Sequence, residues 1–326
     1  MTKTTRIILC ALSALVLMAC GGKKSAQEQQ PVFSADSAYA YVQAQMAFGP
    51  RVPNGDGHTR CAVYLIEKLR EAGAYVELQK GEMPDYSGRQ QKIFNIIGHF
   101  NMEAQGQPVL LCAHYDTRPW CDEEEDYMDR YMNVPGANDG ASGVAVLLEV
   151  ARQLGLSADS AYATFGMYKQ PVDIVFFDCE DMGTPTFYTG AQRENTWCLG
   201  SQLWAAQNEV PYQFGILLDM VGAPDATFPR EFYSSQYAAN YQEKVWRAAG
   251  ELGYGRYFSN LVSYPITDDH FYVNTIAGVP CVDIIHYDAN GLSGFAPWWH
   301  TREDDMRNIS AETLMAVGRV VLQTIR

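Results

Sequence analysis

The chain has 326 residues, of which 47% are hydrophobic and 19% are charged, so it can bury a sizeable core and does not have the composition of a disordered segment. Its formal net charge of −14 at pH 7 argues against nucleic acid as a partner.

The N-terminus has the pattern of a bacterial export signal. Lys3 and Arg6 precede the apolar stretch 7–18, which is too short to span a bilayer as a mature helix. The stretch ends in "LMAC" followed by two glycines, which resembles the lipobox of lipoproteins, where the cysteine is cleaved free and acylated. We expect Cys20 to become an acylated N-terminus. The alternative is an ordinary signal peptide with an incidental cysteine.

This pattern predicts three segments. Residues 1–19 are a signal peptide, residues 20–32 a polar tether, and residues 33–326 a single catalytic domain. The mature protein is then exported and anchored to a membrane only through its lipid, facing the periplasm or the cell surface.

After the tether, helical and strand-like patterns alternate along the chain, without a repeat or an internal linker. The expected strands are 75–79, 93–100, 109–113, 173–177, 214–218 and 281–285. The expected helices are 36–47, 59–72, 140–154, 237–252, 269–277 and 310–325. This order predicts an α/β fold, a single domain with a mostly parallel, mixed central sheet flanked by helices.

Several of the expected strands end in side chains that can bind a metal. His114 and Asp116 follow one strand, Glu180 and Asp181 follow another, and Asp219 follows a third. Ligands of such sheets bind at the carboxyl ends of the strands, so these groups should meet at one edge. Two further candidates come from a Gly-rich turn before a helix and from the loop before the last helix: Asp139 and His300.

Crowded carboxylates repel one another and take up protons unless a cation neutralises them, so this edge predicts a metal ion. Carboxylate and imidazole ligands without clustered thiolates fit a catalytic zinc, whereas the histidines disfavour calcium. Asp139 has another interpretation, because aspartate is favoured as the cap of a helix such as the one expected from residue 140.

Other acidic and histidine residues have structural interpretations. The run 122–126, "DEEED", lacks the glycine and the ligand alternation of a calcium loop, and we interpret it as a solvated insertion. Asp178, His58 and His99 are expected to be structural. For His286, a place in the pocket and a packed structural role are equally compatible with the sequence.

The motifs taken together resemble the zinc aminopeptidase superfamily, which includes the glutaminyl-peptide cyclotransferases. They are "HYD" at 114–116, "NDGASG" at 138–143, the acidic pair 180–181, Asp219 and the late His300. The cyclotransferase branch is the more similar, through "LLDMVGAPDATFPRE", "ITDDHFYVNTIAGVP" and "PWWHT".

The resemblance implies a role for each matching residue. One zinc ion per chain would be held by Asp139, Asp181 and His300, with Glu180 as the proton shuttle. Asp219 and Asp268 would line the site, and Trp299 would wall the substrate pocket. His114 and Asp116 would lie beside the metal ligands without holding the metal. Independently of the resemblance, Trp197 is a second candidate for the pocket wall, because it lies near the loop after the acidic pair. The family pattern usually has Glu-Glu where this chain has Glu180-Asp181, so the carboxylate is kept and the ligand geometry changes.

The implied activity is zinc-dependent cyclisation of N-terminal glutamine, on peptides or proteins, to pyroglutamate with release of ammonia, by a monomer. One alternative is a two-zinc aminopeptidase on the same scaffold, in which Glu180 activates water and His114, Asp139 and Asp219 hold the second zinc. A catalytically silent, metal-bound peptide-binding lipoprotein ranks last, because Glu180 is present.

Overall fold

The computed structural model describes residues 32–326 except 159–167, 169, 192 and 289–292. The predicted signal peptide, Cys20 and all but the last residue of the tether therefore lie outside the described residues. Within the described part of the chain, no helix is long and apolar enough to cross a membrane.

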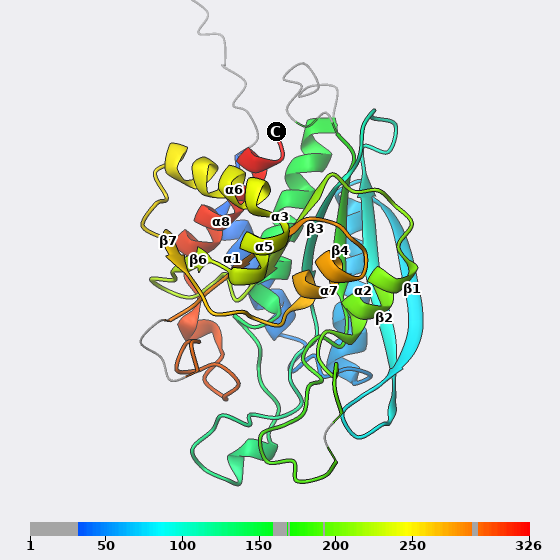
Figure 1. The fold of residues 1–326 in the computed structure, drawn as a ribbon, viewed down its shortest axis with the longest axis vertical. Helices are drawn as coiled ribbons and strands as arrows, with labels where there is room; N and C mark the ends of the chain where they lie inside the picture. Colours follow the sequence, from blue (N-terminus) through cyan, green and yellow to red (C-terminus); the bar gives the residue numbers. More distant parts are fainter. Residues whose placement is uncertain (1–31, 159–167, 169, 192, 289–292) are drawn as a thin grey trace, which may run out of the picture. The chain divides into compact units, whose positions relative to one another are not determined.

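A six-stranded sheet forms the centre of the domain, in the order β1-β2-β4-β3-β5-β8 (Figure 1). β4, β3, β5 and β8 pair in parallel, and β2 runs antiparallel to both of its neighbours. The strand bounds are β1 Tyr75–Pro84, β2 Gln90–Phe100, β3 Val109–His114, β4 Val172–Phe177, β5 Phe214–Asp219 and β8 Cys281–Ile285. The predicted mixed α/β fold is confirmed, and each of the six predicted strands is present.

The central strands are apolar throughout because both faces of the sheet are covered. Successive side chains of a strand point to opposite faces, so Leu111 packs in one core and its neighbour Cys112 in the other. In the same way, Phe176 on β4 joins the first core and Phe177 the second. This double burial explains the continuous apolar runs that mark the strands in the sequence.

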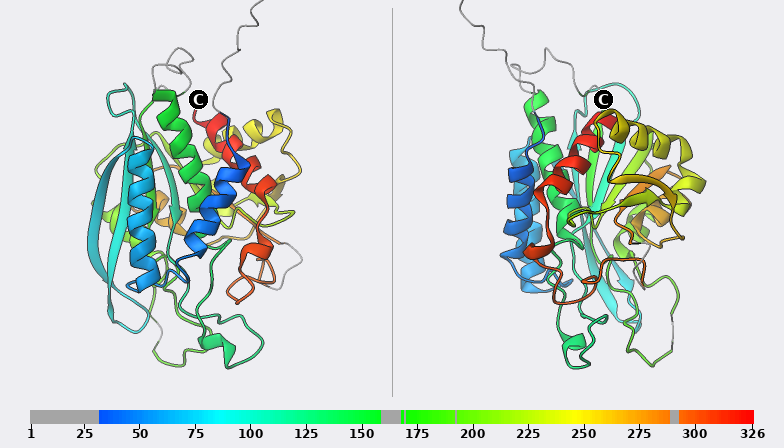
Figure 2. Two further views of the ribbon diagram at one scale, coloured as in Figure 1. Left: turned by 180° about the vertical axis from the view of Figure 1, so that it is seen from behind. Right: turned by 90° about the vertical axis from the view of Figure 1, so that its left-hand side faces the viewer.

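Helices cover the two faces in separate groups (Figure 2). The first face carries α1 Ala35–Met46, α2 Asp56–Glu71, α3 Ala141–Ala158 and α8 Ala311–Thr324, and α6 Ala239–Glu251 packs beside α8. The second face carries α4 Leu199–Gln207, α5 Phe232–Tyr237 and α7 Asp269–Thr275. Short 3₁₀ turns occur at Asp129–Tyr131 and Met306–Asn308, and β6 Phe228–Arg230 pairs with β7 Phe258–Val262 in a small second sheet. The sequence patterns missed α4, α5, β6 and β7, which are short.

Two glycines of "NDGASG" let α3 start close to the edge where the strands end. Gly140 has φ +92°, and a Cβ there would lie 2.6 Å from the carbonyl oxygen of Asp116. A Cβ on Gly143 would lie 2.1 Å from the carbonyl oxygen of Leu218, so only glycine permits this approach of α3 to β5. The turn thereby places Asp139 beside the ends of β3 and β5.

Candidate active site

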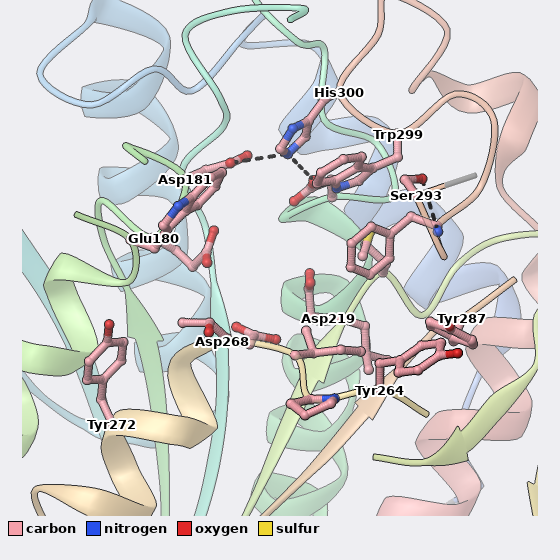
Figure 3. Close-up of a pocket in the computed structure, with 18 of the residues that line it drawn as sticks. Glu180, Asp181, Asp219, Tyr264, Asp268, Tyr272, Tyr287, Ser293, Trp299 and His300 are labelled. Carbon is pink, nitrogen blue, oxygen red and sulfur yellow. Dashed lines mark hydrogen bonds and ion pairs between the residues drawn. The ribbon is translucent and has the colours of Figure 1, made fainter. Parts of the chain in front are cut away.

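The polar side chains predicted to meet at the carboxyl edge of the sheet do converge on one cavity, of about 500 Å³ (Figure 3). Its lining includes eight of the predicted site residues: Asp139, Glu180, Asp181, Trp197, Asp219, Asp268, Trp299 and His300. The other two, His114 and Asp116, are buried next to it. The cavity is also walled by Tyr264, Tyr272 and Tyr287.

The three predicted zinc ligands form one cluster. His300 Nε2 lies 3.3 Å from Asp181 Oδ1 and 3.5 Å from Asp139 Oδ2. Two atoms bound to one zinc ion at the tetrahedral angle lie about 3.3 Å apart, so these separations suit a shared ion. Asp181 Oδ2 is buried without a hydrogen-bond partner among the described residues, which leaves it available as a ligand. Asp139, Asp181 and His300 therefore fit a zinc ion with an open position.

The electrostatics of His300 also favour a cation at this point. Burial lowers the pKa of the imidazole, but the Asp181 carboxylate and the contacts with Asp122 and Asp139 outweigh burial and raise the pKa to about 10. The surrounding carboxylates thus stabilise a positive charge, which either a proton or a metal ion supplies.

A second candidate ligand set shares Asp139 with the first. His114 Nε2 lies 3.1 Å from both Asp139 Oδ1 and Asp219 Oδ1, within the range of a direct hydrogen bond. Burial lowers the pKa of His114, but hydrogen bonds to Asp116, Asp139 and Asp219 raise it well above its ordinary value. A protonated His114 can therefore bridge the two carboxylates without a second metal.

The acidic pair is positioned by Asp116. Its two carboxylate oxygens accept hydrogen bonds from the backbone N–H groups of Glu180 (3.0 Å) and Asp181 (3.2 Å). Asp116 is fully buried, and its Oδ1 lies 3.5 Å from His114 Nδ1. The end of β3 thereby fixes the loop that follows β4.

Glu180 lies beside the ligand cluster and belongs to neither ligand set. Burial raises the pKa of Glu180 well above its ordinary value; His114 lowers it, and the carboxylates of Asp181 and Asp268 raise it further. Cys198 donates a thiol hydrogen bond to Glu180 Oε1, with a Sγ–Oε1 distance of 3.1 Å. Sequence reasoning missed Cys198, because a lone cysteine before a short helix carries no signal of its own.

Several side chains of the site come from residues in left-handed backbone conformations. Cys179 before the acidic pair, Cys198, Met220 after β5 and His300 have φ between 49° and 57°. Non-glycine residues with positive φ are uncommon and cost about 1–3 kcal/mol each, so the surrounding structure must hold them in place. Their concentration around one cavity is typical of a functional site.

The prediction that residues 122–126 form a solvated insertion is wrong for the first of them, Asp122. Asp122 is buried and binds Arg118 through both carboxylate oxygens, at 2.6 Å each. Asp122 Oδ1 also lies 3.6 Å from His300 Nδ1, on the side of the ring away from the ligand cluster. Arg118 stacks over Trp197 at 4.6 Å. The local charge pattern groups Asp122 with its neighbours in the acidic run. It could not predict that Asp122 is buried, because the residues that cover it come from distant segments of the chain.

We expect Asp122→Asn to destabilise the protein. The change removes the bidentate charge partner of the buried Arg118 guanidinium and leaves only the longer contact of 3.5 Å with Asp181. Breaking a buried ion pair typically costs about 3–5 kcal/mol of the free energy of unfolding. The substitution also loosens His300, and such supporting groups contribute about 10- to 100-fold to metal affinity. Urea unfolding measures the first effect and zinc titration of the metal-free protein the second.

Glu125→Gln is the matched control, because Glu125 belongs to the same acidic run and is exposed. If Asp122→Asn and Glu125→Gln unfolded at the same urea concentration, the buried Asp122–Arg118 pair would have no structural importance.

The loop that carries Asp139 is held from two sides. The Asp304 carboxylate accepts hydrogen bonds from the backbone N–H groups of Asn138 (2.7 Å) and Asp139 (3.0 Å). Arg51 donates to the carbonyl oxygens of Pro135 and Gly136, at 2.5 Å each. The Asp139 carboxylate faces His114 and His300, which favours the ligand interpretation over the helix cap. No sequence pattern predicted the supporting role of Asp304 or of Arg51.

The other histidines examined from the sequence lie away from the ligand cluster. His58 Nε2 lies 2.7 Å from Asp178 Oδ1, and Asp178 Oδ2 accepts the backbone N–H of Phe94, so both residues brace the end of β4. His99 pairs with Asp173 on the sheet. His286 accepts the backbone N–H of Thr227 and lines a neighbouring cavity.

The chain is similar to known proteins in sequence and in fold. Residues 95–325 match peptidase family M28. A Tannerella forsythia glutaminyl cyclase is 50% identical, with a TM-score of 0.84, covering 90% of this chain and 99% of that one. A Zn-dependent exopeptidase from Parabacteroides distasonis is 47% identical, with a TM-score of 0.85, covering 91% and 99%.

A curated relative, the glutaminyl-peptide cyclotransferase of Boiga irregularis, is 27% identical over 70% of this chain. The matched region spans 63% of the length of that relative. The family match covers most of the domain and includes the ends of β3, β4 and β5 and the loop of His300. This chain therefore belongs to peptidase family M28.

Proposed function

We propose that this protein cyclises the N-terminal glutamine of peptides or proteins to pyroglutamate and releases ammonia, with zinc as cofactor. The observation that carries the proposal is the position of Glu180, a buried carboxylate beside the cluster of Asp139, Asp181 and His300 in a cavity walled by Trp299. The similarity to a bacterial glutaminyl cyclase at 50% identity supports the cyclase reaction.

In this reaction the α-amine of the substrate attacks the γ-amide carbon of the same residue, a C–N bond forms, and the amide nitrogen leaves as ammonia. Asp139, Asp181 and His300 would hold the zinc ion, which would supply Lewis-acid polarisation of the γ-carbonyl. Glu180 accepts the proton from the attacking amine and donates it to the leaving nitrogen, which leaves poorly unless protonated. Burial raises the pKa of Glu180 above its ordinary value, which is the direction that favours a carboxyl group donating a proton as well as accepting one.

Membership of family M28 and the similarity to a Zn-dependent exopeptidase support zinc as the metal. We propose one ion per chain. His114 Nε2 lies 3.1 Å from both Asp139 Oδ1 and Asp219 Oδ1, so a protonated imidazole can hold these two carboxylates together without a second ion.

The deciding experiment offers the purified zinc-loaded protein two peptides that differ only in the first residue, glutamine or leucine. We expect ammonia release and loss of the free amine from the glutamine peptide, with the leucine peptide intact. The proposal would be contradicted if the leucine peptide released free leucine and the glutamine peptide released no ammonia.

The same experiment tests a two-zinc aminopeptidase, the second candidate. Two observations favour keeping it: the set His114, Asp139 and Asp219 is assembled, and one of the similar structures is a Zn-dependent exopeptidase. In that reaction Glu180 activates a water molecule and the peptide bond after the first residue breaks.

We further propose that the protein is an exported lipoprotein anchored through Cys20, on the basis of the "LMACGG" sequence. Cys20→Ala is expected to move the protein from the membrane fraction to the aqueous fraction with unchanged activity, because the catalytic domain follows a polar tether. Membrane fractionation with immunodetection measures this. A variant that stays with the membrane would rule out Cys20 as the anchor.

A further inference from the structure

A second cavity, of about 860 Å³, adjoins the active-site cavity, and we call it the outer cavity. The two cavities share Tyr264 and Tyr287 as walls. Figure 3 shows both tyrosines on the side of the active-site cavity away from Glu180. The rest of the outer cavity comes from β7, β6 and the loop before it, the residues that follow β8 and the segment before Trp299. A ligand that leaves the active site past these tyrosines therefore enters the outer cavity.

The outer cavity has an exposed apolar wall. Leu261, Val262 and Tyr264 have exposed fractions of 66%, 61% and 78%, and Trp298 adds a half-buried indole. Large apolar side chains gathered on one exposed strand and the residue close behind it are typical of a binding surface. This wall offers contacts to an aromatic or aliphatic side chain of a ligand.

The charged groups of both cavities are almost all negative. Asp225 and Asp288 line the outer cavity, and the described residues that line either cavity include no lysine or arginine. Burial lowers the pKa of His286 in the outer cavity, so this ring is neutral near pH 7. The whole chain has a formal net charge of −14 at pH 7. An acidic ligand is therefore repelled and a basic one attracted.

We propose that the outer cavity binds the substrate residues that follow the N-terminal glutamine, and that it selects apolar and basic side chains over acidic ones. This inference rests on the proposed function. Cyclisation uses both the α-amine and the side chain of the glutamine. The rest of the peptide is therefore attached only through the α-carbonyl and extends from that side of the residue. An extended chain advances about 3.3 Å per residue, and the two cavities share walls, so the residues that directly follow the glutamine are the ones placed to enter the outer cavity.

The test compares kcat/KM for three substrates: Gln-Ala-amide, Gln-Phe-Lys-amide and Gln-Phe-Glu-amide. The first hardly enters the outer cavity and reports on the active site alone. We expect Gln-Phe-Lys-amide to exceed Gln-Ala-amide about tenfold, the low end of what an added apolar contact contributes to kcat/KM. Gln-Phe-Glu-amide should fall below Gln-Phe-Lys-amide, mainly through KM.

Two variants of residues that line only the outer cavity locate the effect. Leu261→Ser should remove most of the advantage of the phenylalanine peptides. Asp225→Asn should reduce the preference for lysine over glutamate; Asp225 has φ 53°, a conformation that asparagine tolerates. Both variants should cyclise Gln-Ala-amide at the wild-type rate. Matched controls are Leu78→Ser, on the strand at the opposite edge of the sheet, and Glu209→Gln, both exposed.

Three outcomes separate the proposals. Equal kcat/KM for all three substrates, or equal effects of Leu261→Ser and Leu78→Ser, would overturn the outer-cavity proposal and leave the cyclase function standing. Failure of the wild-type protein to cyclise Gln-Ala-amide would overturn the proposed function itself. Loss of the phenylalanine advantage only in Leu261→Ser would support the subsite.

Discussion

Glu180→Gln is expected to abolish turnover while the zinc stays bound. The substitution nearly preserves the shape of the side chain and removes the group that transfers the proton. General acid–base groups typically contribute about 10²–10⁴-fold to the rate, so kcat should fall by that factor. Zinc should be retained because Glu180 lies beside the cluster of Asp139, Asp181 and His300 and is not one of its members. Ammonia release measures kcat, and elemental analysis measures the zinc.

The control for this variant is Glu194→Gln, an exposed glutamate in the loop that follows the acidic pair. It should keep the wild-type rate and the wild-type zinc content. A Glu180→Gln protein that turned over at near the wild-type rate would remove Glu180 from the mechanism. Loss of zinc together with activity in Glu180→Gln would instead make Glu180 a ligand.

The second large effect concerns the metal ligands. Asp181→Ala and His300→Ala should each lose zinc and activity together, because a catalytic zinc with three protein ligands has none to spare. Asp139→Ala should behave in the same way. His114→Ala should keep one zinc per chain, since His114 Nε2 lies within hydrogen-bond distance of Asp139 and Asp219 and, in our proposal, holds no metal. Elemental analysis of each purified variant gives the zinc content.

The comparison of His300→Ala with His114→Ala separates the one-zinc and two-zinc assignments. Asp139 cannot separate them, because it belongs to both candidate ligand sets. Two zinc ions in the wild-type protein, with one lost in His114→Ala, would overturn the single-zinc assignment. The aminopeptidase function would then become the better proposal.

The sequence by itself determined the sheet and the place of the site. Strands such as β3 and β4 are buried on both faces, so their residues form continuous apolar runs that local patterns detect. A polar group directly after such a run must lie at the edge of the sheet, which is why His114, Asp181 and Asp219 could be placed together in advance. The short elements α5 and β6 were missed, because three to six residues carry too little periodicity.

The tertiary structure decided which polar groups support the site and what surrounds it. Asp122 is buried because Arg118 and His300 lie against it, and His300 is 178 positions further along the chain. Cys198 reaches Glu180 across a loop, and the outer cavity is assembled from β7, the loop before β6, the residues that follow β8 and the loop of Trp298. Burial of a charge and the shape of a cavity depend on contacts between distant segments, whereas sequence patterns report only on near neighbours in the chain.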